Sequence, residues 1–253
     1  MFDWEYIDEV YLYDGTFYGL LSIVFDTYLI DKIPVKICSE MDYEYNLLDK
    51  TTFVQTDLEK AKRICDGLVK NVSFDALYNA YNAFLSGQKN TELTILKYVI
   101  SAFKIGPEIN NMLAIDYVLD TIKLRKNTGF EAHRLKGLLK FRCISENLYY
   151  APIHPDNNVI EHVGKHFVNR LPQQNFIIHD KNRNIAFVYD TKEYSVMDVP
   201  DNFVMPEFSD EEKLYQSLWK TFFKTIAIKE RTNKRLQMQY MPKKYWQDLV
   251  EID

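Results

Sequence analysis

The spacing of apolar residues changes once along this chain, and that change limits the folds open to it. From Asp57 to about Lys126, apolar side chains recur every three to four residues, which predicts helices near 57–70, 73–86, 90–104 and 110–126. Beyond them, short apolar runs at 138–144, 148–153, 176–179, 185–189 and 194–197 are typical of strands, with one helix near 157–170. The pattern predicts an α+β protein in which a helical layer packs on an antiparallel sheet.

The two ends of the chain add further elements. Residues 10–13 are expected to form a strand, Asp14-Gly15 a tight turn, and Thr16 the cap of a helix that runs to about Asp31. Gly19 inside that helix indicates the close approach of another segment, and short strands are expected at 35–38 and 52–55. Near the other end, a capping box at 209–212 opens an amphipathic helix, whose apolar face is expected to pack on the rest of the protein.

Glycine and proline are scarce, with 8 of each in 253 residues, and no stretch is typical of a flexible linker. We therefore expect one compact domain over residues 1–253. Its parts would be a strand–helix opening at 1–56, a helical layer at 57–137, an antiparallel sheet at 138–200, and a C-terminal helix with a basic tail at 209–253.

Missing motifs exclude several classes of protein. No apolar run approaches the roughly 18 to 20 residues of a membrane span, and the N-terminal residues lack the basic start of a signal peptide, so we expect a cytoplasmic protein with no membrane partner. The three cysteines form no CxxC motif and no glycine-rich phosphate loop is present, so we expect no cofactor. His162 and His166 lie four residues apart, but without an HExxH motif we expect no metal site.

Charge is distributed unevenly, although the formal net charge is only −5. Residues 1–60 hold 13 acidic and 4 basic side chains, whereas 123–142 hold 7 basic and 1 acidic, and 220–246 hold 8 basic and 1 acidic. Two basic segments on an otherwise acidic chain are typical of a one-sided surface for nucleic acid, although solvated helix faces also collect lysines.

The first basic segment contains the densest group of reactive side chains. His133 and Glu131 are the candidate catalytic residues, because an imidazole beside a carboxylate can move a proton. Arg134, Lys136 and Arg142 are candidate phosphate contacts. The alternative is a capped, salt-bridged helix end, with Gly137 as a left-handed cap before the strand at 138–144.

The second basic segment, at 231–246, interleaves cations with aromatic rings. Its cations could neutralise phosphates while its rings stack on unpaired bases, at about 1–3 kcal/mol per base. The alternative is a tail whose rings dock into the core. The candidate nucleic-acid contacts here are Arg231, Arg235, Tyr240, Lys243, Lys244 and Trp246.

Three segments of this chain resemble a known family. They are YDGTFYGLL at 13–21, EAHRLKGLLKF at 131–141 and RTNKRLQMQYMPKKYW at 231–246. Together they are similar to the bacterial DNA-repair (DNA-metabolism) family of unknown biochemical activity, and His166, Arg170 and Asp180 look like that family's later blocks. The resemblance implies DNA as a ligand and a radical-SAM protein of DNA modification or repair as a partner. A similar domain also occurs fused to a uracil-DNA-glycosylase-like domain.

Three hypotheses about function follow. The first is a DNA-repair protein that binds damaged or single-stranded DNA through the two basic segments and works with a radical-SAM partner. The second is an enzyme acting on DNA, a lyase, nuclease or glycosylase-like catalyst, that uses His133 with Glu131 or Asp180. The third is a protein-interaction subunit without DNA contact. The sequence leaves open whether the protein is an enzyme.

Overall fold

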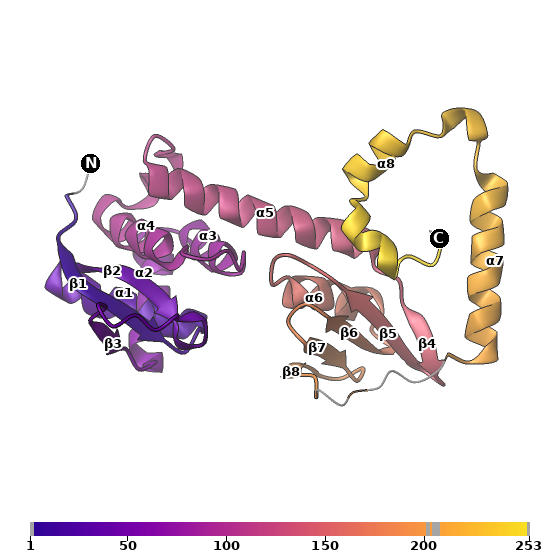
Figure 1. The fold of residues 1–253 in the computed structure, drawn as a ribbon, viewed down its shortest axis with the longest axis horizontal. Coiled ribbons are helices and arrows are strands. Elements are labelled where there is room, and N and C mark those ends of the chain that lie inside the picture. The colour runs from indigo at the N-terminus through magenta and orange to yellow at the C-terminus, as the bar shows by residue number, and fades with distance from the viewer. Residues whose placement is uncertain (1–2, 201–202, 204–207, 252–253) are drawn as a thin grey trace. The chain divides into compact units, whose positions relative to one another are not determined.

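The computed structural model describes residues 3–200, 203 and 208–251. These residues form two compact units, Met1–Gly129 and Phe130–Asp253, whereas the sequence led us to expect a single compact domain (Figure 1). Each unit has its own apolar core, and the boundary falls inside the long helix α5 (Asp116–Leu138). Helices and two separate sheets are both present, which confirms the α+β class.

Unit 1 opens with a small parallel sheet of order β2-β1-β3. Its strands are β1 (Tyr6–Tyr13), β2 (Ile33–Ser39) and β3 (Thr51–Phe53). Helix α1 (Phe17–Ile30) provides the crossover that parallel strands β1 and β2 require, and the short helix η1 (Glu40–Asp42) lies between β2 and β3. The expected strand, turn and helix at the start of the chain are confirmed.

The motif residues Asp14, Gly15 and Gly19 shape the turn between β1 and α1. The Asp14 carboxylate accepts hydrogen bonds from Thr16 N at 2.9 Å and from Thr56 Oγ1 at 2.7 Å. Gly15 has a φ of +78°. A Cβ on Gly19 would lie 2.3 Å from Asp14 Oδ1 and 2.8 Å from Thr56 Oγ1, so only glycine fits without displacing these groups. The close approach expected at Gly19 therefore comes from the protein's own turn.

Four segments form the helical layer of unit 1: α2 (Leu58–Asn71), α3 (Phe74–Phe84), α4 (Glu92–Ile105) and the short η2 (Pro107–Asn111). Asp57 caps α2 by accepting from the amides of Glu59 and Lys60. Leu68, Val99 and Ile109 are buried in the core that these helices share with α1. The first part of α5 completes this core.

Helix α5 corrects the prediction for residues 110–144. One helix covers Asp116–Leu138, and the next strand, β4, begins only at Arg142, so no strand starts at Leu138. Gly137 lies inside the helix, and it is not among the glycines with a positive φ, so it is not the left-handed cap of the alternative interpretation. The helix continues because Leu135 still has a core to pack against in unit 2.

Gly137→Ala is therefore expected to raise the free energy of unfolding by up to about 1 kcal/mol, because alanine stabilises a helix relative to glycine. A Cβ at this position meets no atom within 4 Å. Thermal unfolding of the two proteins measures the change. A left-handed glycine cap would give the opposite sign, since alanine is strained at positive φ.

Unit 2 is built on a five-stranded sheet of order β4-β5-β6-β7-β8. Its elements are β4 (Arg142–Ser145), β5 (Leu148–Ile153), α6 (Ile160–Arg170), β6 (Asn175–Asp180), β7 (Ile185–Tyr189) and β8 (Tyr194–Asp198). Strands β5 and β6 are parallel, so the sheet is mixed and the fully antiparallel sheet predicted from the sequence is wrong. The reason is α6, which returns the chain to the end of the sheet where β5 began.

Side chains alternate between the two faces of this sheet. Phe176, Ile178 and Phe187 lie on the face that packs against α6 and are buried in the core of unit 2. Tyr150 and His179 therefore lie on the opposite face. The second face thus carries polar side chains that are nevertheless buried.

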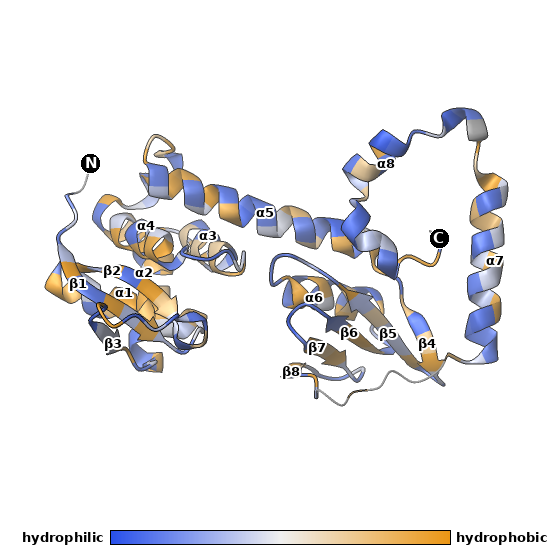
Figure 2. Ribbon diagram, viewed as in Figure 1, coloured by the Kyte–Doolittle hydropathy of each residue, from blue (hydrophilic) through white to orange (hydrophobic). Residues whose placement is uncertain are grey.

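The C-terminal part of unit 2 consists of α7 (Asp210–Ile226), η3 (Lys229–Arg231), α8 (Lys234–Tyr240) and η4 (Lys243–Asp248). The predicted cap is present, because Ser209 Oγ accepts from Glu212 N at 3.1 Å. The apolar face of α7 was expected to pack, yet Leu214, Leu218 and Phe222 are more than half exposed. Figure 2 shows hydrophobic and hydrophilic residues interspersed along α7. None of the helices formed by the described residues combines the length and apolar character needed to cross a membrane.

Candidate nucleic-acid interface

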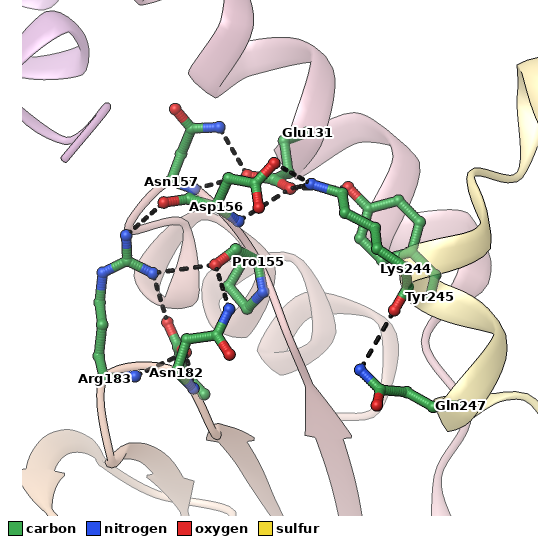
Figure 3. A network of polar contacts seen from close by, with 10 residues as sticks. Glu131, Pro155, Asp156, Asn157, Asn182, Arg183, Lys244, Tyr245 and Gln247 are labelled. Carbon is green, nitrogen blue, oxygen red and sulfur yellow. Dashed lines mark hydrogen bonds and ion pairs between the residues drawn. The ribbon is translucent and has the colours of Figure 1, made fainter. Parts of the chain in front are cut away.

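A buried polar network centred on Glu131 joins the end of α5 to the C-terminal segment of unit 2 (Figure 3). The Glu131 side chain is almost fully buried and accepts hydrogen bonds from Asn157 N at 2.7 Å, Asn157 Nδ2 at 2.6 Å and the Tyr245 hydroxyl at 2.7 Å. It also accepts from Asp156 N at 3.1 Å and forms an ion pair with Lys244. Every lone pair of this carboxylate therefore faces a donor.

These donors decide the charge of the network. Burial alone would raise the pKa of Glu131, but hydrogen bonds from Lys244, Asn157 and Tyr245 lower it to about 2. The pKa of Lys244 is raised, because its contacts with Asp156 and Glu131 outweigh the effect of burial. Both groups are therefore ionised at neutral pH, and they hold η4 against the end of α5.

Arg183 extends the network toward the turn between β6 and β7. Its Nη1 donates to Pro155 O at 3.2 Å and to Asp180 Oδ2 at 3.1 Å, while its Nη2 donates to Asp156 O at 2.5 Å. Asp180 is fully buried, and burial raises the pKa of its carboxyl group. Both arms of the network converge on residues 155–157, the loop between β5 and α6.

The structure does not bring the two candidate catalytic residues together. Glu131 points into the network, whereas His133 is exposed two residues further along the same helix, where side chains do not face each other. Asp180 is engaged by Arg183 and by two turn amides, so it does not orient His133 either. The hypothesis of an enzyme based on His133 loses both of its candidate partners.

The candidate phosphate contacts separate into two groups. Lys244 is held by Glu131 and Asp156, and the Arg142 guanidinium donates to Asp248 O at 3.1 Å. The remaining cations belong to the other group, with no acidic partner among residues 3–200, 203 and 208–251. They are Arg134, Lys136, Arg231, Arg235 and Lys243, all exposed except the half-buried Lys136.

A groove of about 670 Å³ lies where α7 ends and α8 begins. Phe223, Leu236 and Tyr240 give it apolar walls, while Arg231 and Gln237 contribute polar groups. The Tyr240 ring is 70 % exposed. The structure thus places the exposed arginine and tyrosine of the second basic segment in one concave surface.

The other two rings of the basic tail are part of the fold. Tyr245 is buried and bonded to Glu131. The Trp246 indole donates to Met241 O at 2.9 Å and is half-buried, with the Lys243 ammonium 6.0 Å from the ring centre. Docking of the tail's rings into the core, the alternative left open by the sequence, therefore holds for Tyr245 and in part for Trp246.

Helix α6 carries the remaining motif residues. His166 is half-buried with its ring 5.1 Å from that of Phe167, and Arg170 is exposed in the last turn. Among the residues that the structure describes, no group of three or more His, Cys, Asp or Glu side chains could hold a metal ion.

Sequence reasoning missed two sets of contacts in unit 2. Asn157 and Arg183 complete the Glu131 network, and His154 pairs with Asp248, 94 residues away. No local spacing signals such pairs. The only available clue was that His154-Pro155-Asp156-Asn157 places four polar or turn-forming residues directly after a strand.

A family model for DUF4130, a domain of unknown function, matches residues 89–251. The chain belongs to the DUF4130 family. The DUF4130 match includes the Glu131 network and the groove at α8. Because the function of DUF4130 is unknown, DNA repair, the radical-SAM partner and the link to glycosylase-like domains stay predictions from the resemblance of the sequence.

Two other comparisons accompany the DUF4130 match. No curated protein matches the sequence. Among solved structures, the pGpG-specific phosphodiesterase PggH from Vibrio cholerae is similar at 10 % identity and a TM-score of 0.34, over 71 % of this chain and 81 % of its own. A TM-score this low supports no conclusion about the fold or function of the DUF4130 protein.

Proposed function

We propose that this protein binds DNA through unit 2, in DNA repair or DNA metabolism. The observation that supports this most is the set of cations without acidic partners in the described residues, on α5 and around α8. Unpaired, exposed arginines are suited to phosphate, because the guanidinium presents a planar fork of donors. Their counterparts Lys244 and Arg142 show that this unit pairs its structural cations with internal acceptors.

The groove at α8 favours single-stranded or damaged DNA over an intact duplex. Tyr240 offers an exposed ring face on which an unpaired base could stack, beside the Arg231 guanidinium. Asn233 and Gln237 also line the groove and could hydrogen-bond a base edge or sugar. A base within a duplex is stacked on its neighbours and would have to leave the helix to enter.

The resemblance of the sequence extends the proposal to a radical-SAM protein of DNA modification or repair as the partner. In this arrangement the DUF4130 protein holds the DNA, and the partner supplies the chemistry. The exposed apolar face of α7 is compatible with the alternative of a protein-interaction subunit. That alternative does not account for Arg231 and Arg235, the exposed arginines that follow α7 in the chain.

Replacing Arg134, Arg231 and Arg235 together by alanine is expected to weaken binding to a single-stranded oligonucleotide and to flatten its salt dependence. Each lost phosphate contact removes about 0.7 from the slope of log K against log salt, so the slope should change by about 2. Fluorescence anisotropy across a salt series measures both quantities.

The matched control removes three exposed lysines from unit 1, Lys62, Lys70 and Lys89, and should leave the slope unchanged. Equal losses in the two triple variants would mean that binding follows net charge alone, which contradicts the proposed interface. Absence of binding at low salt in the wild-type protein would leave the cations as a surface for an acidic protein partner.

A further inference from the structure

The face of the five-stranded sheet opposite α6 carries a cluster of ionisable side chains that the proposed DNA contacts do not use. Tyr150 on β5 and His179 on β6 lie on this face. Arg142 pairs with Tyr150 across β4 and β5 and shares its face. His154 follows directly after the end of β5, and Asp248 reaches the cluster from η4.

His154 is held by Asp248. The imidazole Nδ1 lies 3.0 Å and 3.1 Å from the two carboxylate oxygens, and Arg142 Nη2 donates to the backbone oxygen of the same aspartate. This contact fixes the ring and places a hydrogen on Nδ1. The other nitrogen, Nε2, makes no hydrogen bond to the described residues, and the side chain is 26 % exposed. His154 is therefore oriented and open to a ligand.

His179 is the buried counterpart. Its Nδ1 lies 2.8 Å from the Tyr150 hydroxyl, and its Nε2 is buried without a hydrogen-bond partner in the described part of the chain. Burial lowers the pKa of His179, and the neighbouring Asn184 amide offsets this only in part, so the ring is neutral at pH 7. Burial also raises the pKa of Tyr150, whose hydroxyl keeps its hydrogen. With Tyr150 donating to Nδ1, Nε2 carries a hydrogen; the Asn184 amide lies close enough to influence the pKa of the ring, but it forms no hydrogen bond with Nε2.

Arg142 repeats this pattern, because its Nε is buried and has no partner among the described residues. A buried donor without an acceptor costs roughly 1–3 kcal/mol, so two of them on one sheet face are unusual for a purely structural cluster. Both donors would be satisfied by a ligand that brings acceptor oxygens. The Arg142 guanidinium, a fixed positive charge in the cluster, favours an anion as this ligand.

We propose that Arg142, His154 and His179 form a binding site for a phosphate group. A tetrahedral oxyanion offers acceptors in several directions, as donors from β4, β5 and β6 require, whereas a planar carboxylate offers them in one plane. Asp248 acts as a positioning residue that keeps His154 Nε2 directed away from the pair. The site is independent of the cations proposed to contact the DNA backbone, and the phosphate could belong to a free nucleotide or to the end of a DNA strand.

Titration of the wild-type protein with inorganic phosphate, followed by ¹⁵N NMR of the histidine side chains, tests the site. The Nε2 signals of His154 and His179 should move and saturate in the millimolar range or below, while those of His166 on α6 stay in place. Arg142→Ala and His154→Gln should each weaken phosphate binding about tenfold or more, the effect of losing one charge-assisted hydrogen bond. Lys62→Ala removes an exposed cation of unit 1 and should change nothing.

A lack of saturable change in the His154 and His179 signals would overturn the proposal, as would equal weakening by Lys62→Ala. Because Arg142 also contacts η4, Arg142→Lys serves as the second variant. It keeps the positive charge but loses the planar set of guanidinium N–H donors, so it should still bind phosphate more weakly than the wild type. Unchanged phosphate affinity in both Arg142 variants would exclude this residue from the site and the proposal with it.

The source of the phosphate is decided by comparing a 5′-phosphorylated oligonucleotide, its unphosphorylated form and a nucleoside monophosphate. Tighter binding of the phosphorylated strand that disappears in His154→Gln identifies a DNA end, and monophosphate binding without that gain identifies a free nucleotide. If DNA binding keeps its salt dependence while no phosphate signal is seen, the site fails and the DNA interface stands. If the phosphate signal is seen while DNA binding loses its salt dependence, the phosphate site stands and the DNA interface fails.

Discussion

Lys244→Met is expected to destabilise unit 2 by about 3–5 kcal/mol, the cost of leaving the partner of a buried ion pair uncompensated. The substitution keeps most of the side-chain volume but removes the ammonium that faces the buried Glu131 carboxylate. The remaining donors, from Asn157 and Tyr245, are neutral and do not replace it. Hydrogen exchange of the core amides of Phe176 and Ile178 measures the change in unit 2 alone.

The control for this variant is Lys243→Met, one residue earlier in η4, where the side chain is exposed and has no acidic partner in the described residues. Its effect should stay within about 0.5 kcal/mol. In the double variant Glu131→Gln/Lys244→Met, the protein should recover much of the stability lost in Lys244→Met, because no buried charge remains. Equal losses in both lysine variants would mean that the network does not stabilise the unit.

The same network sets a dependence of stability on pH. The pKa of Glu131 falls from an ordinary value of 4.5 to about 2 in the folded protein. Its contribution to folding, about 3 kcal/mol for a shift of this size, is complete above pH 4.5 and is lost as the pH falls toward 2. Glu131→Gln should remove that part of the acid dependence of hydrogen exchange in unit 2. An identical acid profile in the variant would show that another group is responsible.

Gly164→Ala is expected to destabilise unit 2 by about 1–3 kcal/mol, in spite of the gain in helix propensity. A Cβ on Gly164 of α6 would lie 2.4–2.5 Å from ring atoms of Phe187 on β7. That ring cannot move aside easily, because it is fully buried and stacked between Phe176 and Tyr194. The free energy of unfolding of unit 2, again from hydrogen exchange, measures the effect.

A double-variant cycle isolates the clash at Gly164 from other effects. Phe187→Leu alone leaves a cavity and costs stability. Combined with Gly164→Ala, it should cost less than the sum of the two single changes, because the smaller side chain leaves room for the new methyl group. If the stability losses of the two single variants simply add, the close contact between Gly164 and Phe187 is contradicted. Stabilisation of the protein by Gly164→Ala alone would contradict it more directly.

Local patterns in the sequence were sufficient for most helices of unit 1 and for its opening motif. The caps at Thr16, Asp57 and Ser209 depend on hydrogen bonds between residues two or three apart, which a sequence displays directly. Gly19 was also readable as a point of close approach, although the sequence did not identify Asp14 and Thr56 as the groups that approach it. The α+β class followed from periodicity, which depends on the chain alone.

The tertiary structure decided the features that depend on distant partners. Helix α5 runs past Gly137 because Leu135 is buried in the core of unit 2, and β5 lies parallel to β6 because α6 crosses between them. Which basic residues pair with acidic side chains was also decided by distant partners. Lys244 is neutralised by Glu131, 113 residues away, whereas Arg231 and Arg235 meet no acidic side chain in the described residues.

The sequence by itself thus determined which side chains are cationic, which segments are amphipathic and where helices begin, because these properties reside in neighbouring residues. Only the tertiary structure decided which cations are left for a ligand. Pairing a buried charge requires a partner at hydrogen-bonding distance, and that distance is set by the packing of strands and helices far apart in the chain. For the same reason the orphaned donors of His179 and Arg142 became visible only in the folded protein.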